Sequence, residues 1–342
     1  MTLTEIKQSL KGSNYDFLRE HPSLGNNIIL MGLGGSHAYG TNIDGSDLDI
    51  RGIALNSKPE ILLGNDFEQV ADPITDTVIY SLNKIIKLLI NCNPNTIEIL
   101  GLLPEQYIHL SPIGQELIDN RDMFLSKRAI YAFGGYANQQ LYRLNQKSSH
   151  ALAQAELEKH IGRTLESMMI DFHSRYTTFE DDWFKIYPDV STREGYDSEL
   201  YLDINLHHYP VRDWAGMFAE MTTCVRSYKK IGKRNSKAIE HGKIAKHMMH
   251  LVRLYLMCFD IVEKGEINTY RANEHKYLME IRNGKYIDEN NQVDPEFFRL
   301  VDELEEHLEH DKELNILPDQ PDFERINAFV MDVNERIIRG TI

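Results

Sequence analysis

The chain has 342 residues, with 37 Lys and Arg against 52 Asp and Glu, so its formal net charge is −15. Hydrophobic residues make up 42% and charged residues 26%. This composition excludes a wholly disordered chain, because such chains lack the apolar surface that offsets the entropy cost of ordering. No apolar run approaches the roughly 18 residues that cross a membrane, so we expect no membrane partner. The length favours two domains.

The N-terminal stretch and the cysteines indicate where the protein works. Residues 1–11 lack the apolar segment of a secretory signal. Cys92, Cys224 and Cys258 are odd in number and form no CxxC pair, which predicts neither a disulfide framework nor a zinc site. We therefore expect a cytoplasmic protein in a reducing compartment.

The first third of the chain alternates strand-like and helix-like segments. Asn26–Leu33 is a short apolar run that ends in glycines, which predicts a buried strand. Leu48–Leu55 alternates polar and apolar residues, and Thr75–Ser81 is rich in β-branched and aromatic residues, so strands are predicted there too. Leu82–Ile90 has helical spacing, and Pro94 begins a second short helix.

Helical patterns dominate after about residue 125. The predicted helices are Lys127–Asn145, Leu152–Tyr176, Arg212–Lys230, Ser236–Lys264, Asp294–Asp311 and Phe323–Ile338. The segment Asp181–Asn205 contains Pro188 and Gly195 and is predicted to be an irregular connection.

One segment opposes the charge of the whole chain. Arg226–Arg253 contains nine basic residues and one acidic residue, a pattern that favours contact with an anion. A solvated helix face balanced by acidic neighbours is the alternative. Helical spacing brings Lys246, His250 and Arg253 to one side, where they are candidates for binding a triphosphate or an acceptor's phosphates. A loose Arg234 and His241 pattern leaves RNA cleavage as a further alternative, although chance explains it.

The most informative stretch is GLGGSHAYGTNIDGSDLDIRG, residues 32–52. It is not a dinucleotide fingerprint, because His37 stands where a third glycine is needed. It is not a P-loop, because Thr41 stands where the lysine belongs. It is not an EF-hand, because Asp49 and Leu55 stand where that loop needs glycine and glutamate.

What remains is a strand, a Gly-Ser turn and a pair of acids. Gly34 and Gly35 permit a sharp turn and the close approach of a ligand, and Ser36 is expected to cap a helix whose free N–H groups suit a phosphate. Asp47 and Asp49 stand two apart at the head of a predicted strand, so both side chains are expected on one face. Mg²⁺ prefers carboxylate, water and phosphate oxygens, so this pattern suits phosphoryl transfer with two Mg²⁺ ions.

The order Gly35-Ser36 followed by Ser46-Asp47-Leu48-Asp49 resembles the GS…SDxD signature of the DNA polymerase β-like nucleotidyltransferase superfamily. The phrases GSHAYGT, GSDLDIRGI and NPNTIEIL are similar to the YcgL-like group of predicted bacterial and phage nucleotidyltransferases, and the similarity continues into KHMMHLVRLYLM and LMEIRNGKY. The resemblance implies transfer of a nucleoside monophosphate from an NTP such as ATP to a hydroxyl. Asp47 and Asp49 would hold two Mg²⁺ ions, for which Mn²⁺ can substitute, and Gly35, Ser36 and Ser46 would lie by the phosphates.

The superfamily uses a third acidic residue on a neighbouring strand. The resemblance implies Asp76 as this third catalytic, metal-binding acid, with Glu68 and Asp72 as alternatives. Arg51 is two residues beyond Asp49 on the predicted strand face. It either contacts a phosphate or compensates the carboxylates.

The resemblance also implies an α+β fold. A small, mixed-sheet, polymerase β palm-like nucleotidyltransferase domain over residues 1–120 would be followed by an all-helical domain over 121–342 that binds substrate or nucleotide. The favoured acceptor is an RNA or tRNA 3′ end, because phosphate contacts with the basic segment Arg226–Arg253 would strengthen its binding. A protein hydroxyl and a small molecule are alternatives, and a catalytically silent nucleotide-binding or interaction module is the alternative of another class. The oligomeric state stays open.

Overall fold

The computed structural model describes residues 3–145, 184–190, 198–234, 243–288, 293–314 and 316–342. Its strands are β1 (Ile28–Leu33), β2 (Ile50–Ala54), β3 (Gln69–Asp72), β4 (Thr77–Ser81), β5 (Tyr107–Leu110), β6 (Phe184–Val190) and β7 (Ser198–Ile204). Its helices are α1 (Leu3–Ser9), α2 (Phe17–Glu20), α3 (Gly35–Tyr39), α4 (Lys58–Leu63), α5 (Leu82–Ile90), α6 (Pro94–Ile97), α7 (Pro112–Asp119), α8 (Arg128–Asn145), α10 (Val211–Arg234), α11 (Lys243–Phe259), α12 (His275–Arg282), α13 (Pro295–Leu314) and α14 (Phe323–Arg339).

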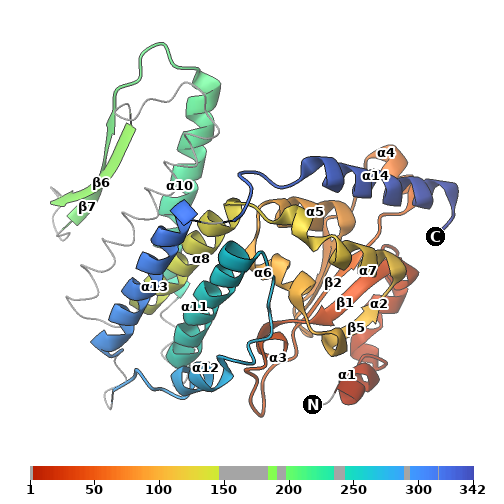
Figure 1. Cartoon of the computed structure of the whole chain (residues 1–342). Helices are drawn as coiled ribbons and strands as arrows, with labels where there is room; N and C mark the ends of the chain where they lie inside the picture. Colours follow the sequence, from red (N-terminus) through yellow and green to blue (C-terminus); the bar gives the residue numbers. More distant parts are fainter. Residues whose placement is uncertain (1–2, 146–183, 191–197, 235–242, 289–292, 315) are drawn as a thin grey trace. The chain divides into compact units, whose positions relative to one another are not determined.

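Five strands form one mixed sheet in the order β3-β4-β2-β1-β5 (Figure 1). Strand β1 pairs antiparallel with β2 and β5, β2 pairs parallel with β4, and β3 pairs antiparallel with β4. The described chain after this sheet is mostly helical, apart from the hairpin of β6 and β7. The predicted α+β fold with a mixed sheet is confirmed, but the prediction that the following part is all-helical was wrong, because it contains the hairpin of β6 and β7.

The chain divides into two compact units. The first comprises residues 1–133, 253–279 and 306–342, and the second comprises residues 134–252 and 280–305. The unit boundaries fall inside the helices α8, α11, α12 and α13. The predicted division of roles at residue 120 stays a prediction.

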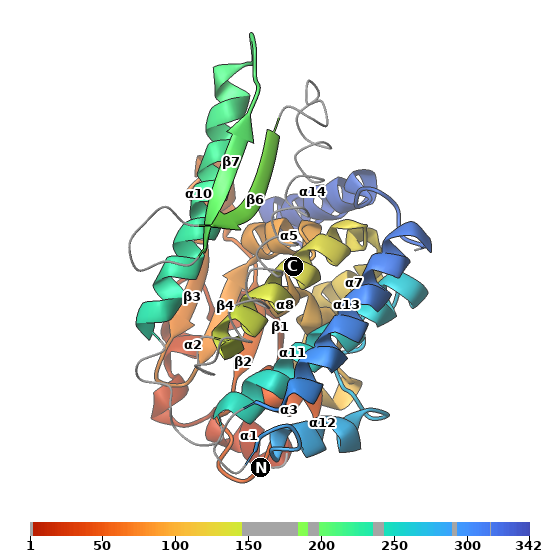
Figure 2. The ribbon, with the colours of Figure 1, turned by 90° about the vertical axis from the view of Figure 1, so that its left-hand side faces the viewer.

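Both faces of the sheet are covered in the first unit. All six residues of β1 are buried, and Ile50, Ala54 and Ile79 join side chains of α1 and α2 in one apolar cluster. Because successive strand residues point to opposite faces, Arg51 and Tyr80 point to the other face, where they line a pocket together with Ile85 of α5. Figure 2 shows α1 and α2 low on this unit and α5 above them.

Short-range signals define the helix that follows β4. Ser81 accepts a hydrogen bond from the backbone N–H of Lys84 and so caps α5. The apolar residues of α5 recur on one side, which buries Leu82, Ile85 and Leu89 against the sheet. This is why the predicted helix Leu82–Ile90 has the observed bounds of α5.

Several predicted elements differ from the structure. Asp181–Asn205 is not an irregular connection: its described residues form the antiparallel hairpin of β6 and β7, in which Pro188 stands opposite Leu200. The helix predicted from Ser236 is described only from Lys243, where α11 begins, and residues 152–176 lie outside the described residues. In the described part of the chain, no helix combines the length and the apolar character needed to cross a membrane.

Candidate active site

The glycine turn after β1 is shaped around one carboxylate. Gly35 has a φ of +54°, and an ideal Cβ placed on it would lie 1.9 Å from Asp49 Oδ2. Any other residue at this position would therefore meet both backbone strain and a collision with the carboxylate. The backbone N–H of Gly34 donates to the carbonyl oxygen of Asp49 at 2.8 Å. The turn and the second acid of the SDxD motif are thus in direct contact.

Helix α3 follows this turn, but Ser36 does not cap it. The N-cap is Gly34, and no side chain there accepts a hydrogen bond. The prediction that Ser36 is the cap was wrong, because the helix begins two residues earlier: the Gly34 carbonyl oxygen already accepts from the N–H of Ala38 at 3.3 Å. Ser36 is buried in the first turn, and its carbonyl oxygen accepts from the N–H of Thr41.

Asp47 and Asp49 lie just before β2 and not on it. The strand begins at Ile50. A turn lies before the two acids, and in it the Ser46 hydroxyl accepts from the N–H of Ile43 at 2.9 Å. Asp47 is exposed, whereas Asp49 is partly buried. The prediction that the two acids lie on a strand was wrong: they follow the turn of residues 43–46, in the segment that leads into β2.

Arg51 connects Asp49 with Asp76. Its Nη2 lies 3.6 Å from Asp49 Oδ1 and 3.1 Å from Asp76 Oδ1, and its Nη1 donates to the Asp76 carbonyl oxygen at 2.5 Å. Asp76 is a turn residue with a φ of +45° directly before β4. Strands β2 and β4 pair in parallel, with Ile50 opposite Thr77. Asp49 and Asp76 therefore stand next to each other in the pairing, just before the N-terminal ends of these two strands.

The two alternative third acids are held by local partners. Glu68 lies 2.7 Å from Lys84 Nζ, and that hydrogen bond lowers the pKa of the exposed Glu68 carboxyl. Asp72 accepts from the hydroxyl and the N–H of Thr75 at 2.6 and 3.0 Å, and the hydroxyl bond lowers the pKa of Asp72. Neither carboxylate contacts Arg51 through a hydrogen bond or ion pair that the structure describes, whereas Asp76 does. This difference favours Asp76 as the candidate for the third acid.

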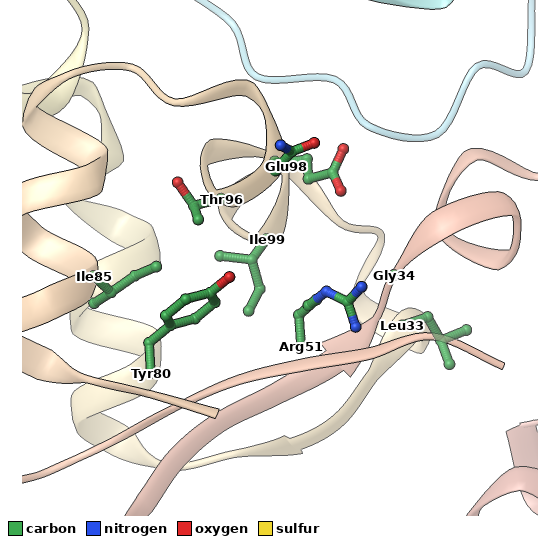
Figure 3. A pocket seen from close by; sticks show the side chains of 9 residues that line it. Leu33, Gly34, Arg51, Tyr80, Ile85, Thr96, Glu98 and Ile99 are labelled. Carbon is green, nitrogen blue, oxygen red and sulfur yellow. The ribbon is translucent and has the colours of Figure 1, made fainter. Parts of the chain in front are cut away.

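A small pocket adjoins Arg51 (Figure 3). Its cavity volume is about 10 Å³, which is room for roughly one water molecule. The lining residues are Leu33, Gly34, Arg51, Tyr80, Ile85, Asn95, Thr96, Glu98 and Ile99. Figure 3 shows Arg51 and Tyr80 extending from their strands toward the segment that carries Thr96 and Glu98.

Glu98 is a buried acid that the sequence reasoning missed. Its carboxylate accepts from the Tyr39 hydroxyl at 2.9 and 3.1 Å and lies 3.4 Å from Arg253 Nη1. The guanidinium carbon of Arg253 lies 3.6 Å from the centre of the Tyr39 ring. Burial raises the pKa of Glu98, and the nearby Arg253 opposes this shift. A signal existed: Glu98 stands between Ile97 and Ile99 in an otherwise apolar run.

The candidates on α11 lie in different surroundings. Arg253 is 4% exposed and belongs to the first unit, where it binds Glu98 and Tyr39. Lys246 and His250 belong to the second unit, in which Lys246 is exposed and His250 is partly buried. Lys237 and His241 lie outside the described residues.

Comparison with known families agrees with this geometry. Residues 7–160, somewhat less than half of the chain, match the family model RlaP, described as "RNA repair pathway DNA polymerase beta family". The resemblance to polymerase β-like nucleotidyltransferases is confirmed over this part of the chain. It contains the glycine turn, the SDxD motif, Asp76 and Glu98. Searches of curated proteins and of solved structures gave no match.

Proposed function

We propose that this protein is a nucleotidyltransferase that moves a nucleoside monophosphate from an NTP to an acceptor hydroxyl. The acceptor oxygen forms a bond to the α-phosphorus, the bond from that phosphorus to the β-phosphate bridge oxygen breaks, and pyrophosphate leaves. The hydroxyl proton passes to a nearby carboxylate or to water. Alignment and neutralisation of charge supply most of the rate in such transfers.

The observation that carries the proposal is the contact between the glycine turn and Asp49. A side chain at Gly35 would collide with Asp49 Oδ2, so glycine at this position lets the turn and this carboxylate approach each other closely. Asp47 precedes Asp49 by two residues and is exposed. Two carboxylates beside a glycine turn whose Gly35 is partly exposed, in a part of the chain that matches a polymerase β family, suit a site for a metal-bound triphosphate.

The donor set at this turn suits Mg²⁺. Asp47 and Asp49 offer carboxylate oxygens, the donors that Mg²⁺ and Mn²⁺ prefer together with water and phosphate oxygens. When bound, the two ions would neutralise the charge that develops on the attacking and leaving oxygens. In our proposal Asp76 completes the acidic set, and Gly35, Ser36 and Ser46 lie near the phosphates. Asp47, Asp49 and Asp76 do not lie within 4.8 Å of one another as a group of three.

Arg51 fits a role in phosphate binding. Its guanidinium contacts both Asp49 and Asp76, so a cation that binds these two acids would compete with it. A released Arg51 is well suited to a phosphate, because the planar guanidinium can donate two parallel hydrogen bonds. The pocket that Arg51 lines then offers Tyr80 and Thr96 for further contacts.

An RNA 3′ end is the acceptor that we favour. The matching family is described by an RNA repair pathway, and the sequence between Arg226 and Arg253 carries nine basic residues. Lysine and arginine contacts to phosphates supply much of the affinity for nucleic acid. Lys246 and His250 remain proposed contacts for the acceptor's phosphates, whereas Arg253, which is buried beside Glu98, is no longer proposed as one.

Labelling with each radioactive NTP in the presence of Mg²⁺ tests the proposal. We expect label on RNA that ends in a 3′ hydroxyl and none on the same RNA blocked with a 3′ phosphate. Asp47→Asn together with Asp49→Asn should lower labelling by at least about 100-fold, while Asp44→Asn, an exposed acid in the same turn, should leave it unchanged. Equal labelling by the double variant and the control would refute the assignment.

The same assay separates the alternatives. Label on protein, or on a small molecule without salt dependence, would replace RNA as the acceptor and keep the reaction. NTP binding without transfer to any acceptor would indicate a silent nucleotide-binding module. Steep loss of labelling with rising salt is expected for RNA, because counterions compete at each phosphate contact.

A further inference from the structure

A group of side chains with the donor atoms of a metal site lies within the first unit, outside the glycine turn and the SDxD motif. Glu263 stands in the π-helical turn Asp260–Lys264 that continues α11. His307 and Asp311 stand four residues apart on α13, so they share a helix face. One ligand atom from each of the three residues lies within 4.8 Å of the other two.

The imidazole of His307 lies at the centre of the group. Its Nε2 is 2.9 Å from Glu263 Oε1 and 3.6 Å from Asp311 Oδ2. The ring of Phe259 stacks on the His307 ring, with 4.2 Å between the centres and 26° between the planes. This stacking restricts the orientation of the imidazole, so Nε2 is held toward the two carboxylates.

The buried oxygen Oδ2 of Asp311 is independent evidence for a bound ion or water in this group. The residue is 7% exposed, and its Oδ2 is buried with no hydrogen-bond donor. A buried carboxylate oxygen without a donor is costly, and such a group in a folded protein calls for a water, an ion or a functional reason. This oxygen is also the Asp311 atom that lies 3.6 Å from His307 Nε2.

We propose that Glu263, His307 and Asp311 bind one Zn²⁺ ion. One imidazole nitrogen and two carboxylate oxygens form a set that zinc accepts, with a water as the fourth ligand. Mg²⁺ and Ca²⁺ select sites made of oxygen alone, whereas imidazole favours zinc and its neighbours in the first transition series. The ion would join the end of α11 to α13 and satisfy Asp311 Oδ2. π-helical turns are frequent at functional sites, and this one places Glu263 in the group.

The competing explanation is an ordinary ion pair between His307 and Glu263. That pair accounts for the 2.9 Å distance and leaves Asp311 Oδ2 without a donor. The two explanations differ in what they predict for metal content. A zinc site needs all three side chains, whereas an ion pair involves no metal.

Zinc content of the full chain tests the proposal. The chain with Asp47→Asn and Asp49→Asn, which removes the proposed catalytic ions, is dialysed against buffered Zn²⁺ and measured by elemental mass spectrometry. We expect one zinc per chain, retained in a large excess of Mg²⁺. Adding His307→Gln should weaken zinc binding at least about tenfold, and adding Glu263→Gln should do the same, because each removes one of only three protein ligands.

The matched control adds His275→Gln, which removes an exposed histidine on α12 of the same unit. It should keep one zinc and the same rise in melting temperature on zinc addition, a rise that the His307→Gln and Glu263→Gln chains should lose. Because Glu263 is exposed, its variant should stay folded even if His307→Gln does not. Absence of stoichiometric zinc in the background chain would overturn the proposal, and so would equal zinc affinity of the Glu263→Gln and His275→Gln chains.

Discussion

Carboxylates of the first unit occur in two contrasting surroundings. Asp49 and Asp76 keep exposed fractions of 20% and 56% in their side chains, and both contact Arg51. Glu98 is buried and bound by Tyr39 and Arg253. The first two acids can exchange an arginine for a cation that arrives from solvent. The third cannot do so without leaving Arg253 buried and uncompensated.

We infer from this contrast that the buried Glu98 positions helix α3, whose first residue Gly35 contacts the accessible Asp49. Tyr39 is the last residue of α3, and Gly35, whose backbone contacts Asp49, is the first. Glu98 binds the Tyr39 hydroxyl, so it fixes one end of this short helix while Asp49 lies at the other. Gln106 adds hydrogen bonds to the carbonyl oxygens of His37 and Ala38. We therefore treat Glu98 as a positioning residue.

The largest effect is expected from Gly35→Ala. The added methyl group would meet Asp49 Oδ2, and alanine is strained at a φ of +54°. We expect labelling to fall by at least about 100-fold, because the acid pair and the turn can no longer share this space. Gly64→Ala is the control: its φ is +67°, but its Cβ would meet nothing within 4 Å. It should lose about 1 kcal/mol of stability and keep its activity, and equal activity of both variants would contradict the account.

Arg253→Met should have the next largest effect, mainly on stability. It removes the cation beside the buried Glu98 and should lower the free energy of unfolding by about 3 kcal/mol, as for other buried pairs that lose one partner. Lys246→Met on the same helix removes an exposed cation and should change the unfolding free energy by less than about 0.5 kcal/mol. Urea unfolding compares the two variants. A small effect of Arg253→Met would show that the contact of Arg253 with Glu98 does not stabilise the fold.

A smaller effect concerns pH. Burial raises the pKa of Glu98 above its usual 4.5, so the folded protein keeps this proton at pH values where the unfolded chain has lost it. This contribution to stability is present below about pH 4.5 and is lost as the pH rises through the folded pKa. Glu98→Gln cannot titrate, so the difference in unfolding free energy between wild type and Glu98→Gln should change with pH over this range. A difference that does not vary with pH would contradict the raised pKa.

The smallest effect is expected at Glu68. Its partner is Lys84 on the protein surface, so Glu68→Gln should change neither labelling nor the melting temperature measurably. Asp76→Asn, tested beside it, should lower labelling about tenfold or more, because Asp76 lies by Arg51 and Asp49. If Glu68→Gln lost labelling and Asp76→Asn kept it, Glu68 and not Asp76 would be the third catalytic acid.

Short-range signals in the sequence predicted much of the sheet. The apolar run before Gly34 predicts β1, and the helical spacing of the apolar residues in Leu82–Ile90 predicts α5. Strand β3 has no such signal, because its residues are exposed or partly exposed at the edge of the sheet. Strand β2 begins only at Ile50, a boundary that an alternating pattern does not reveal.

In the candidate site, too, contacts between residues close in sequence were predictable, whereas contacts between distant residues were not. The glycine turn and the SDxD motif are close in sequence, so their association could be predicted. Glu98 binds Tyr39 across 59 positions and Arg253 across 155, and no local pattern connects residues so far apart. The basic spacing on α11 suggested that Arg253 faces a ligand, but the structure pairs it with a buried carboxylate. Burial depends on long-range packing, which the sequence alone does not show.

Counting bound Mn²⁺ by electron paramagnetic resonance, with a non-hydrolysable NTP present, tests the central claim most directly. The His307→Gln chain is used so that the second proposed metal site is removed. We predict that this chain binds Mn²⁺ only in the presence of the nucleotide, that Asp44→Asn leaves this binding intact, and that Asp47→Asn with Asp49→Asn abolishes it. Full Mn²⁺ binding by the double variant would contradict the claim that these two acids hold the catalytic ions.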